Sequence, residues 1–141
     1  MINIKTKEEI ETLREGGKRH SFILAELAKM VTPGLSTQAL EDEARRLIEE
    51  GGDRASFLNY TPRGAKRAFP AALCVSINNV VCHGIPDKTP FLNGNIVNVD
   101  VTTIYDGWHG DTNATFYIGE PSESARLVVE TARESLARGI S

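Results

Sequence analysis

The first 50 residues carry apolar side chains at helical spacing. In the segment 7–30 these positions are Ile10, Leu13, Leu24, Leu27 and Met30. Thr6-Lys-Glu-Glu9 precedes them as a capping box, so we expect a helix over 7–30. A second apolar stripe, ended by Gly51-Gly52, predicts a helix over about 37–50; it is formed by Leu40, Ala44, Leu47 and Ile48.

The middle of the chain has short segments rich in β-branched and aromatic residues, which is typical of strands. We expect strands over 55–60, over 73–77 and on both sides of Asp106-Gly107, a dipeptide that favours a two-residue hairpin turn. A last helix is expected from Ser122 to about Arg138. Its predicted inner face consists of Val128, Val129, Ala132 and Leu136.

The order of these elements is two helices, a group of strands and a final helix. Neighbouring strands are joined by short loops and the helices are separate in sequence. This predicts an α+β fold in which helices pack on one face of an antiparallel or mixed sheet. A length of 141 residues fits one domain, 1–141.

Composition narrows the choice of partners. Charged residues make up 25% of the chain and the formal net charge is −3, so no general attraction to nucleic acid or to an anionic membrane is expected. No apolar run approaches membrane-spanning length, and no signal peptide is visible at the N-terminus. Cys74 and Cys82 are expected to be buried reduced thiols, consistent with a cytoplasmic location.

The hairpin holds the most informative pair of side chains. With Asp106-Gly107 at the turn, Asp100 faces Asn113 and Thr102 faces Asp111. Asp100 and Asp111 then lie diagonally on one face, roughly 7–8 Å apart at the backbone. Two carboxylates aimed at one place repel unless a cation lies between them, so a divalent metal ion is favoured. The alternative is solvent-facing polar alternation on an edge hairpin.

Three histidines and four aromatic residues are weaker candidates. His83 is framed by Gly84 and Pro86 at the expected end of a strand, where it could hold a substrate carbonyl. His109 shares the face of Asp111 and is a candidate ligand or, like Thr102, a candidate neighbour that orients a ligand. His20 is expected to serve packing or the surface. The candidate pocket residues, which could equally be core, are Phe57, Tyr60, Phe69 and Trp108.

Taken together, three segments closely resemble the type I methionine aminopeptidases. They are Val-Cys-His-Gly-Ile-Pro at 81–86, Gly-Asn-Ile-Val-Asn-Val-Asp-Val-Thr at 94–102 and Asp-Gly-Trp-His-Gly-Asp-Thr at 106–112. Pro-Gly-Leu-Ser-Thr at 33–37 and the segment 70–78 are similar to the same family. The resemblance extends along the whole chain.

The resemblance implies a pita-bread fold with two related αβ halves and two divalent metal ions between them. It implies that Asp100 binds one ion, that Asp111 bridges both, and that His83 contacts the substrate near the scissile bond. Phe57, Tyr60, Phe69 and Trp108 would form walls of a pocket for a methionine side chain. The implied activity is removal of the initiator methionine from nascent polypeptides, at the ribosome, with Co, Mn, Fe or Zn as the metal.

Members of that family are about twice as long. Their second half supplies a metal-binding His, two metal-binding Glu and a second substrate-side His. We therefore expect this chain to be an N-terminal half that needs the other half in cis or in trans, and to be inactive alone. Two alternatives remain: a pita-bread module that binds peptides or proteins without catalysis, and a prolidase-like dinuclear peptidase.

Overall fold

Two N-terminal helices form with the predicted bounds. In the computed structural model, which describes residues 2–141, α1 spans Lys7–Met30 and α2 spans Thr37–Glu50. The Thr6 hydroxyl accepts from the Glu9 amide, and the Glu9 carboxylate accepts from the Thr6 amide, so the predicted capping box is present. No helix within 2–141 combines the length and the apolar character needed to cross a membrane.

Four strands form one sheet, and all of its pairings are antiparallel. They are β1 (Arg54–Ala55), β2 (Leu73–Ile77), β3 (Ile96–Tyr105) and β4 (Trp108–Tyr117). β4 pairs with β3 along its whole length, so β1 and β2 share the other edge of β3. Asp106 and Gly107 both have positive φ, +47° and +80°, as the tightest hairpin turns require.

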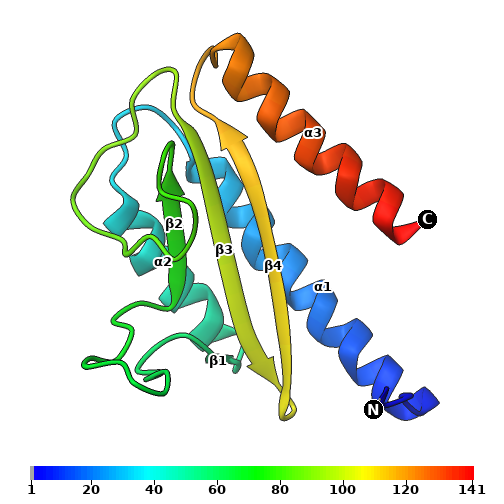
Figure 1. Ribbon diagram of the computed structural model, residues 1–141. Coiled ribbons are helices and arrows are strands. Elements are labelled where there is room, and N and C mark those ends of the chain that lie inside the picture. The colour runs from blue at the N-terminus through cyan, green and yellow to red at the C-terminus, as the bar shows by residue number, and fades with distance from the viewer. Residues whose placement is uncertain (1) are drawn as a thin grey trace.

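The two faces of the sheet differ in character. Val97, Val99 and Val101 of β3 are fully buried in the core that α1 and α2 share with the sheet. Figure 1 shows α1 and α2 lying behind the strands. Asp100 lies between these valines along β3 and therefore points to the opposite, uncovered face. The predicted α+β class, with helices packed on one face of the sheet, is confirmed.

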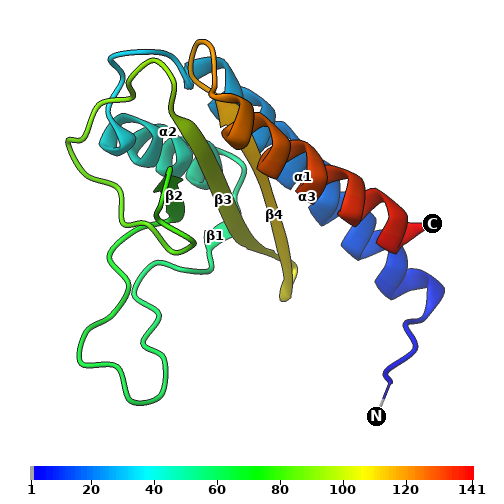
Figure 2. The ribbon, with the colours of Figure 1, turned by 45° about the horizontal axis from the view of Figure 1, so that its top comes forward.

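The strand expected over 55–60 is wrong beyond Ala55. Asn59 has a positive φ of 65°, which ends the extended conformation. The loop is instead closed on itself, since the Asn59 amide donates to the Phe69 carbonyl and the Phe69 amide donates to the Tyr60 carbonyl. Figure 2 shows the segment between β1 and β2 extending away from the sheet.

The last helix, α3, spans Glu123–Ile140 and begins at the predicted N-cap Ser122. Its predicted inner face is only partly correct. Val129 is buried, whereas Val128 and Leu136 are each more than 60% exposed. α3 begins near the end of β4 and slants away from it (Figure 1), and the side chains of residues 2–141 leave most of its apolar positions uncovered.

Candidate metal centre

The hairpin brings Asp100 and Asp111 to the uncovered face in the predicted register. Asp100 is paired with Asn113 on β4 and with Cys74 on β2, so it occupies the middle of the sheet. Asp111 is paired with Thr102, one diagonal step from Asp100. Alternation along the strands gives both carboxylates the same face. The two acidic groups that the sequence singles out are therefore neighbours.

Asp100 has the electrostatic character of an incomplete site. Its Oδ1 atom is buried without a hydrogen-bond partner among residues 2–141, as is the hydroxyl of Thr102. Burial, followed by the charge of Asp111, raises the pKa of Asp100 to about 6, and nearby His83 opposes this rise. A cation supplies what this carboxylate lacks. The oxygen donors therefore fit a divalent metal ion.

His83 does not end a strand, contrary to the expectation from sequence. It lies in the loop after β2, with a φ of 56° that is uncommon for residues other than glycine. Its position is fixed by Gly84, whose carbonyl accepts from the Val75 amide and whose amide donates to the Ser76 hydroxyl. A Cβ at Gly84 would lie 2.1 Å from the Val75 carbonyl oxygen, so this close approach requires glycine.

Three of the four predicted pocket aromatics surround one cavity. A cavity of about 170 Å³ is lined by Phe57, Tyr60, Pro62, Phe69, Cys74 and His83. The rings of Phe57 and Phe69 meet edge to face, with centroids 6.0 Å apart. Cys74 completes the lining and was not singled out for this place by the sequence. Burial raises the pKa of the Cys74 thiol to about 12, so it is a neutral, apolar wall.

The expectation that Trp108 lines the same pocket is wrong. Trp108 pairs with Tyr105 beside the turn, an odd number of residues from Asp111, so it projects from the helix-covered face. There the Lys5 ammonium lies 4.7 Å from the centre of its ring. The predicted register already implied this separation. Cys82 is likewise corrected: it is reduced but exposed rather than buried.

Two residues predicted to orient metal ligands lie beside the carboxylate pair. Thr102 is directly opposite Asp111 in the sheet. His109 pairs with Ile104 on the same face, and its Nδ1 lies 2.8 Å from the Ser56 hydroxyl. This hydrogen bond orients the imidazole toward the loop after β1. Within residues 2–141 no three His, Cys, Asp or Glu side chains gather as potential ligands.

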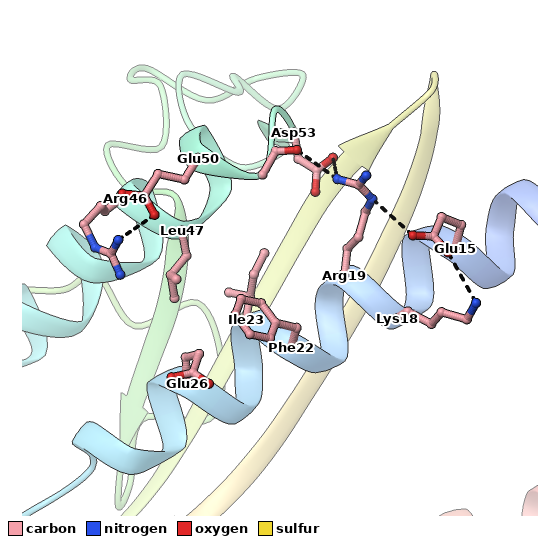
Figure 3. A pocket seen from close by; sticks show the side chains of 11 residues that line it. Glu15, Lys18, Arg19, Phe22, Ile23, Glu26, Arg46, Leu47, Glu50 and Asp53 are labelled. Carbon is pink, nitrogen blue, oxygen red and sulfur yellow. Dashed lines mark hydrogen bonds and ion pairs between the residues drawn. The ribbon is translucent and has the colours of Figure 1, made fainter.

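A larger cavity, about 540 Å³, lies elsewhere, between α1 and the end of α2 (Figure 3). Its charged side chains are paired with one another: Arg19 with Asp53 at 3.3 Å, and Arg46 with Glu50 at 2.6 Å. It lies on the helix side of the sheet, away from Asp100. Its size therefore does not mark it as the reactive site.

The fold and the carboxylate pair define a class of metal-dependent hydrolase. Residues 11–141 match the profile of metallopeptidase family M24, and the chain belongs to this family. Among its curated relatives, methionine aminopeptidase B of Synechocystis sp. is 47% identical over 133 residues, 94% of this chain and 48% of that protein. Methionine aminopeptidase 2 of Mycobacterium tuberculosis is 42% identical, over 97% of this chain and 46% of that protein.

Solved structures agree with this assignment. The crystal structure of methionine aminopeptidase from Rickettsia prowazekii superimposes with a TM-score of 0.91 at 36% identity, over 99% of this chain and 54% of that one. A prolidase from Pyrococcus furiosus reaches 0.74 at 19% identity, which shows the fold alone. The chain thus spans about half the length of the relatives it matches, and the predicted half of a pita-bread fold is confirmed.

Proposed function

We propose that this chain is the N-terminal half of a methionine aminopeptidase, a metal-dependent hydrolase that removes the initiator methionine from new polypeptides. The observation that carries the proposal is the juxtaposition of Asp100 and Asp111, with an Asp100 oxygen buried and unpartnered among residues 2–141. The relatives named methionine aminopeptidases support the choice of reaction.

Asp100 and Asp111 would hold the metal, with Asp111 bridging two divalent ions. Mn, Fe, Co and Zn all suit carboxylate and imidazole ligands. When bound, such ions lower the pKa of water and polarise a peptide carbonyl. The remaining ligands, a His and two Glu, would come from a second half supplied in cis or in trans. Thr102 and His109, beside the pair, would orient the carboxylates.

The cavity beside the pair would receive the substrate. Its apolar wall of Phe57, Tyr60, Phe69 and Cys74 suits a methionine side chain, because a thioether packs favourably against aromatic rings. His83 lines the same cavity and influences Asp100, so it lies between the side-chain pocket and the metal ligands. There its imidazole would donate to the carbonyl oxygen of the scissile peptide.

The partners of such an enzyme would be the N-termini of nascent polypeptides, met at the ribosome in the cytoplasm. Peptide binding through the pocket needs no direct contact with nucleic acid and no membrane. The negative net charge of the chain is consistent with both statements.

Two alternatives are less well supported. A non-catalytic peptide-binding module has no need for a half-buried carboxylate without a partner, because that arrangement is costly without a cation. A prolidase-like activity rests on a likeness at 19% identity, which carries the fold but not the substrate. Relatives at 35–47% identity are methionine aminopeptidases.

The test is methionine release from a Met-Ala-Ser peptide with Mn²⁺, using this chain joined to or mixed with a second half. We expect Asp100→Asn and Asp111→Asn to lower kcat/KM by at least about 100-fold, because each removes a metal ligand. Asp106→Asn is the matched control, since Asn suits the positive φ at the turn. Unchanged activity in both ligand variants rules the proposal out, and release from a prolyl dipeptide instead favours the prolidase alternative.

A further inference from the structure

We propose that His20 is a positioning residue that holds the β3–β4 hairpin from behind and thereby sets Asp111 relative to Asp100. The inference deepens the proposed function and rests on it where metal binding is concerned. His20 lies on α1, on the helix-covered side of the sheet, so its influence on the carboxylates passes through the backbone of the strands.

His20 contacts β3 through a buried hydrogen bond. Its side chain is 3% exposed, and its Nε2 lies 2.6 Å from the hydroxyl of Thr103. Thr103 is itself fully buried. Burial lowers the pKa of His20 and so favours the neutral ring, while the charges of Asp53 and Asp111 act in the opposite direction. Removing either member of such a buried pair leaves the other without a hydrogen-bond partner, so the contact favours this one packing of α1 on the sheet.

His20 also contacts β4, at Gly110. A Cβ built on Gly110 would lie 1.8 Å from the imidazole Cε1, so the ring occupies the space that any other residue would fill. Gly110 is paired directly with Thr103. One imidazole therefore touches both strands at a single pair of residues. Gly16, one turn earlier on α1, lies against Tyr105, and a Cβ there would be 3.7 Å from the Tyr105 side chain.

The Thr103–Gly110 pair, which His20 contacts, is next to the pair that contains Asp111. Thr102 and Asp111 form the adjacent pair, and Asp111 follows Gly110 in the chain. A shift of Gly110 toward or away from α1 would therefore move the Cα of Asp111. Metal ligation tolerates little displacement of its donors, so the support behind a ligand is part of the site.

The first readout is amide hydrogen exchange of the 141-residue chain without metal. In His20→Ala we expect the protected amides of 101–104 and 109–112 to exchange faster than in wild type. The increase should exceed that caused by the change in global stability by on the order of tenfold, which corresponds to the loss of one buried hydrogen bond. The amides of 73–77 report global stability. Thr103→Val, which removes the hydroxyl but keeps the volume, should accelerate the same amides, and His20→Gln should restore part of the protection.

Ile48→Val is the matched control, because it removes a methyl group from the shared core on α2, away from the hairpin. It should accelerate exchange evenly, without a local excess at 109–112. An even loss in His20→Ala, or an equal local excess in Ile48→Val, overturns the proposal. If His20→Ala does not fold, Thr103→Val and His20→Gln decide by the same criterion.

The second readout is Mn²⁺ binding to the same chain, followed by paramagnetic broadening of amide signals near Asp100. We expect His20→Ala to weaken binding about tenfold, as loss of support behind a ligand typically does, with Ile48→Val close to wild type. Unchanged affinity in His20→Ala overturns the positioning role. If wild type shows no broadening, or if the broadening persists in Asp111→Asn, the metal assignment itself fails. In that case the exchange data alone decide whether His20 holds the hairpin.

Discussion

At Gly110 the absence of a side chain is required by a neighbour rather than by the backbone. Gly110 lies within β4, where other residues are normal, but His20 fills the space of its Cβ. Gly110→Ala should destabilise the chain by about 2 kcal/mol through overpacking. The double variant Gly110→Ala/His20→Ala should recover part of that loss, as measured by urea denaturation. Strictly additive losses would contradict a direct contact between the two residues.

The carboxyl of Asp100 links stability to pH. Its pKa is raised to about 6 in the fold, against 3.8 ordinarily, so protonation stabilises the folded state. That stabilisation is fully present below about pH 4 and is lost as the pH rises through 6. Asp100→Asn, which cannot ionise, should match wild type near pH 4 in EDTA and exceed it at pH 7 by about 1 kcal/mol, allowing for solvent screening. Equal melting temperatures at both pH values would contradict this.

The two carboxylates could be located from the sequence because a rule of local geometry, the alternation of side chains along a hairpin, applies to them. The turn dipeptide fixed the register, and the register placed Asp100 and Asp111 on one face. The same rule, applied to Trp108, excludes it from the pocket. The contacts of His20 with the hairpin were not predicted, because its two partners lie 83 and 90 residues further along the chain and meet it only through the packing of α1 on the sheet.

Among the elements, α2 is joined to the start of β2 by a buried carboxylate. Glu41 is 2% exposed, accepts from the amides of Ala72 and Leu73, and forms an ion pair with Arg45 at 2.5 Å. Both of its oxygens are used, so the charge is compensated although it is buried. The start of β2, and with it Cys74 beside Asp100, is held in place by this contact.

Glu41→Gln should therefore lower the free energy of unfolding by about 2 kcal/mol, because the new amide NH₂ faces a backbone donor. Urea denaturation measures the loss. Glu50→Gln on the same helix is the control, since Glu50 is exposed and its ion pair with Arg46 contributes little. A loss for Glu41→Gln no larger than for Glu50→Gln would show that the buried contact is not stabilising.

Elements with regularly spaced apolar residues or a capping residue were predictable from the sequence. Segments held by long-range contacts were not. α1 and α2 have capping residues and regular stripes, and both match their predicted bounds. The loop over 57–69 reads as a strand at its start, but two hydrogen bonds between Asn59, Tyr60 and Phe69 fold it into a pocket wall. Local propensity contains no signal for such a closure.

On the scale of the whole molecule, α3 presents an uncovered apolar stripe. Val128, Ala132, Leu136 and Ile140 recur every four residues and are all exposed. A contiguous apolar surface of this kind favours association. We expect the 141-residue chain to self-associate in sedimentation velocity, and Val128→Gln/Leu136→Gln to reduce this. The control Phe22→Gln/Leu92→Gln removes two scattered exposed apolar residues and should change little. An equal effect of the two double variants would contradict a role for the stripe.

Activity also depends on the whole molecule. In the proposed site the chain would supply two carboxylates, a histidine and a pocket wall, and it spans about half the length of its relatives. By itself it should release no methionine from Met-Ala-Ser with Mn²⁺ or Co²⁺, because two carboxylates leave a divalent ion weakly held. Measurable release by the purified chain would contradict the need for ligands from a second half.

The most direct test of the account is calorimetric titration of the 141-residue chain with Mn²⁺ at pH 7.5, in wild type, Asp100→Asn, Asp111→Asn and Asp106→Asn. We expect weak binding in wild type and in Asp106→Asn, and loss of binding in the other two, because the proposed ion lies between both carboxylates. Binding that survives in Asp100→Asn and Asp111→Asn would contradict it and place the ion elsewhere.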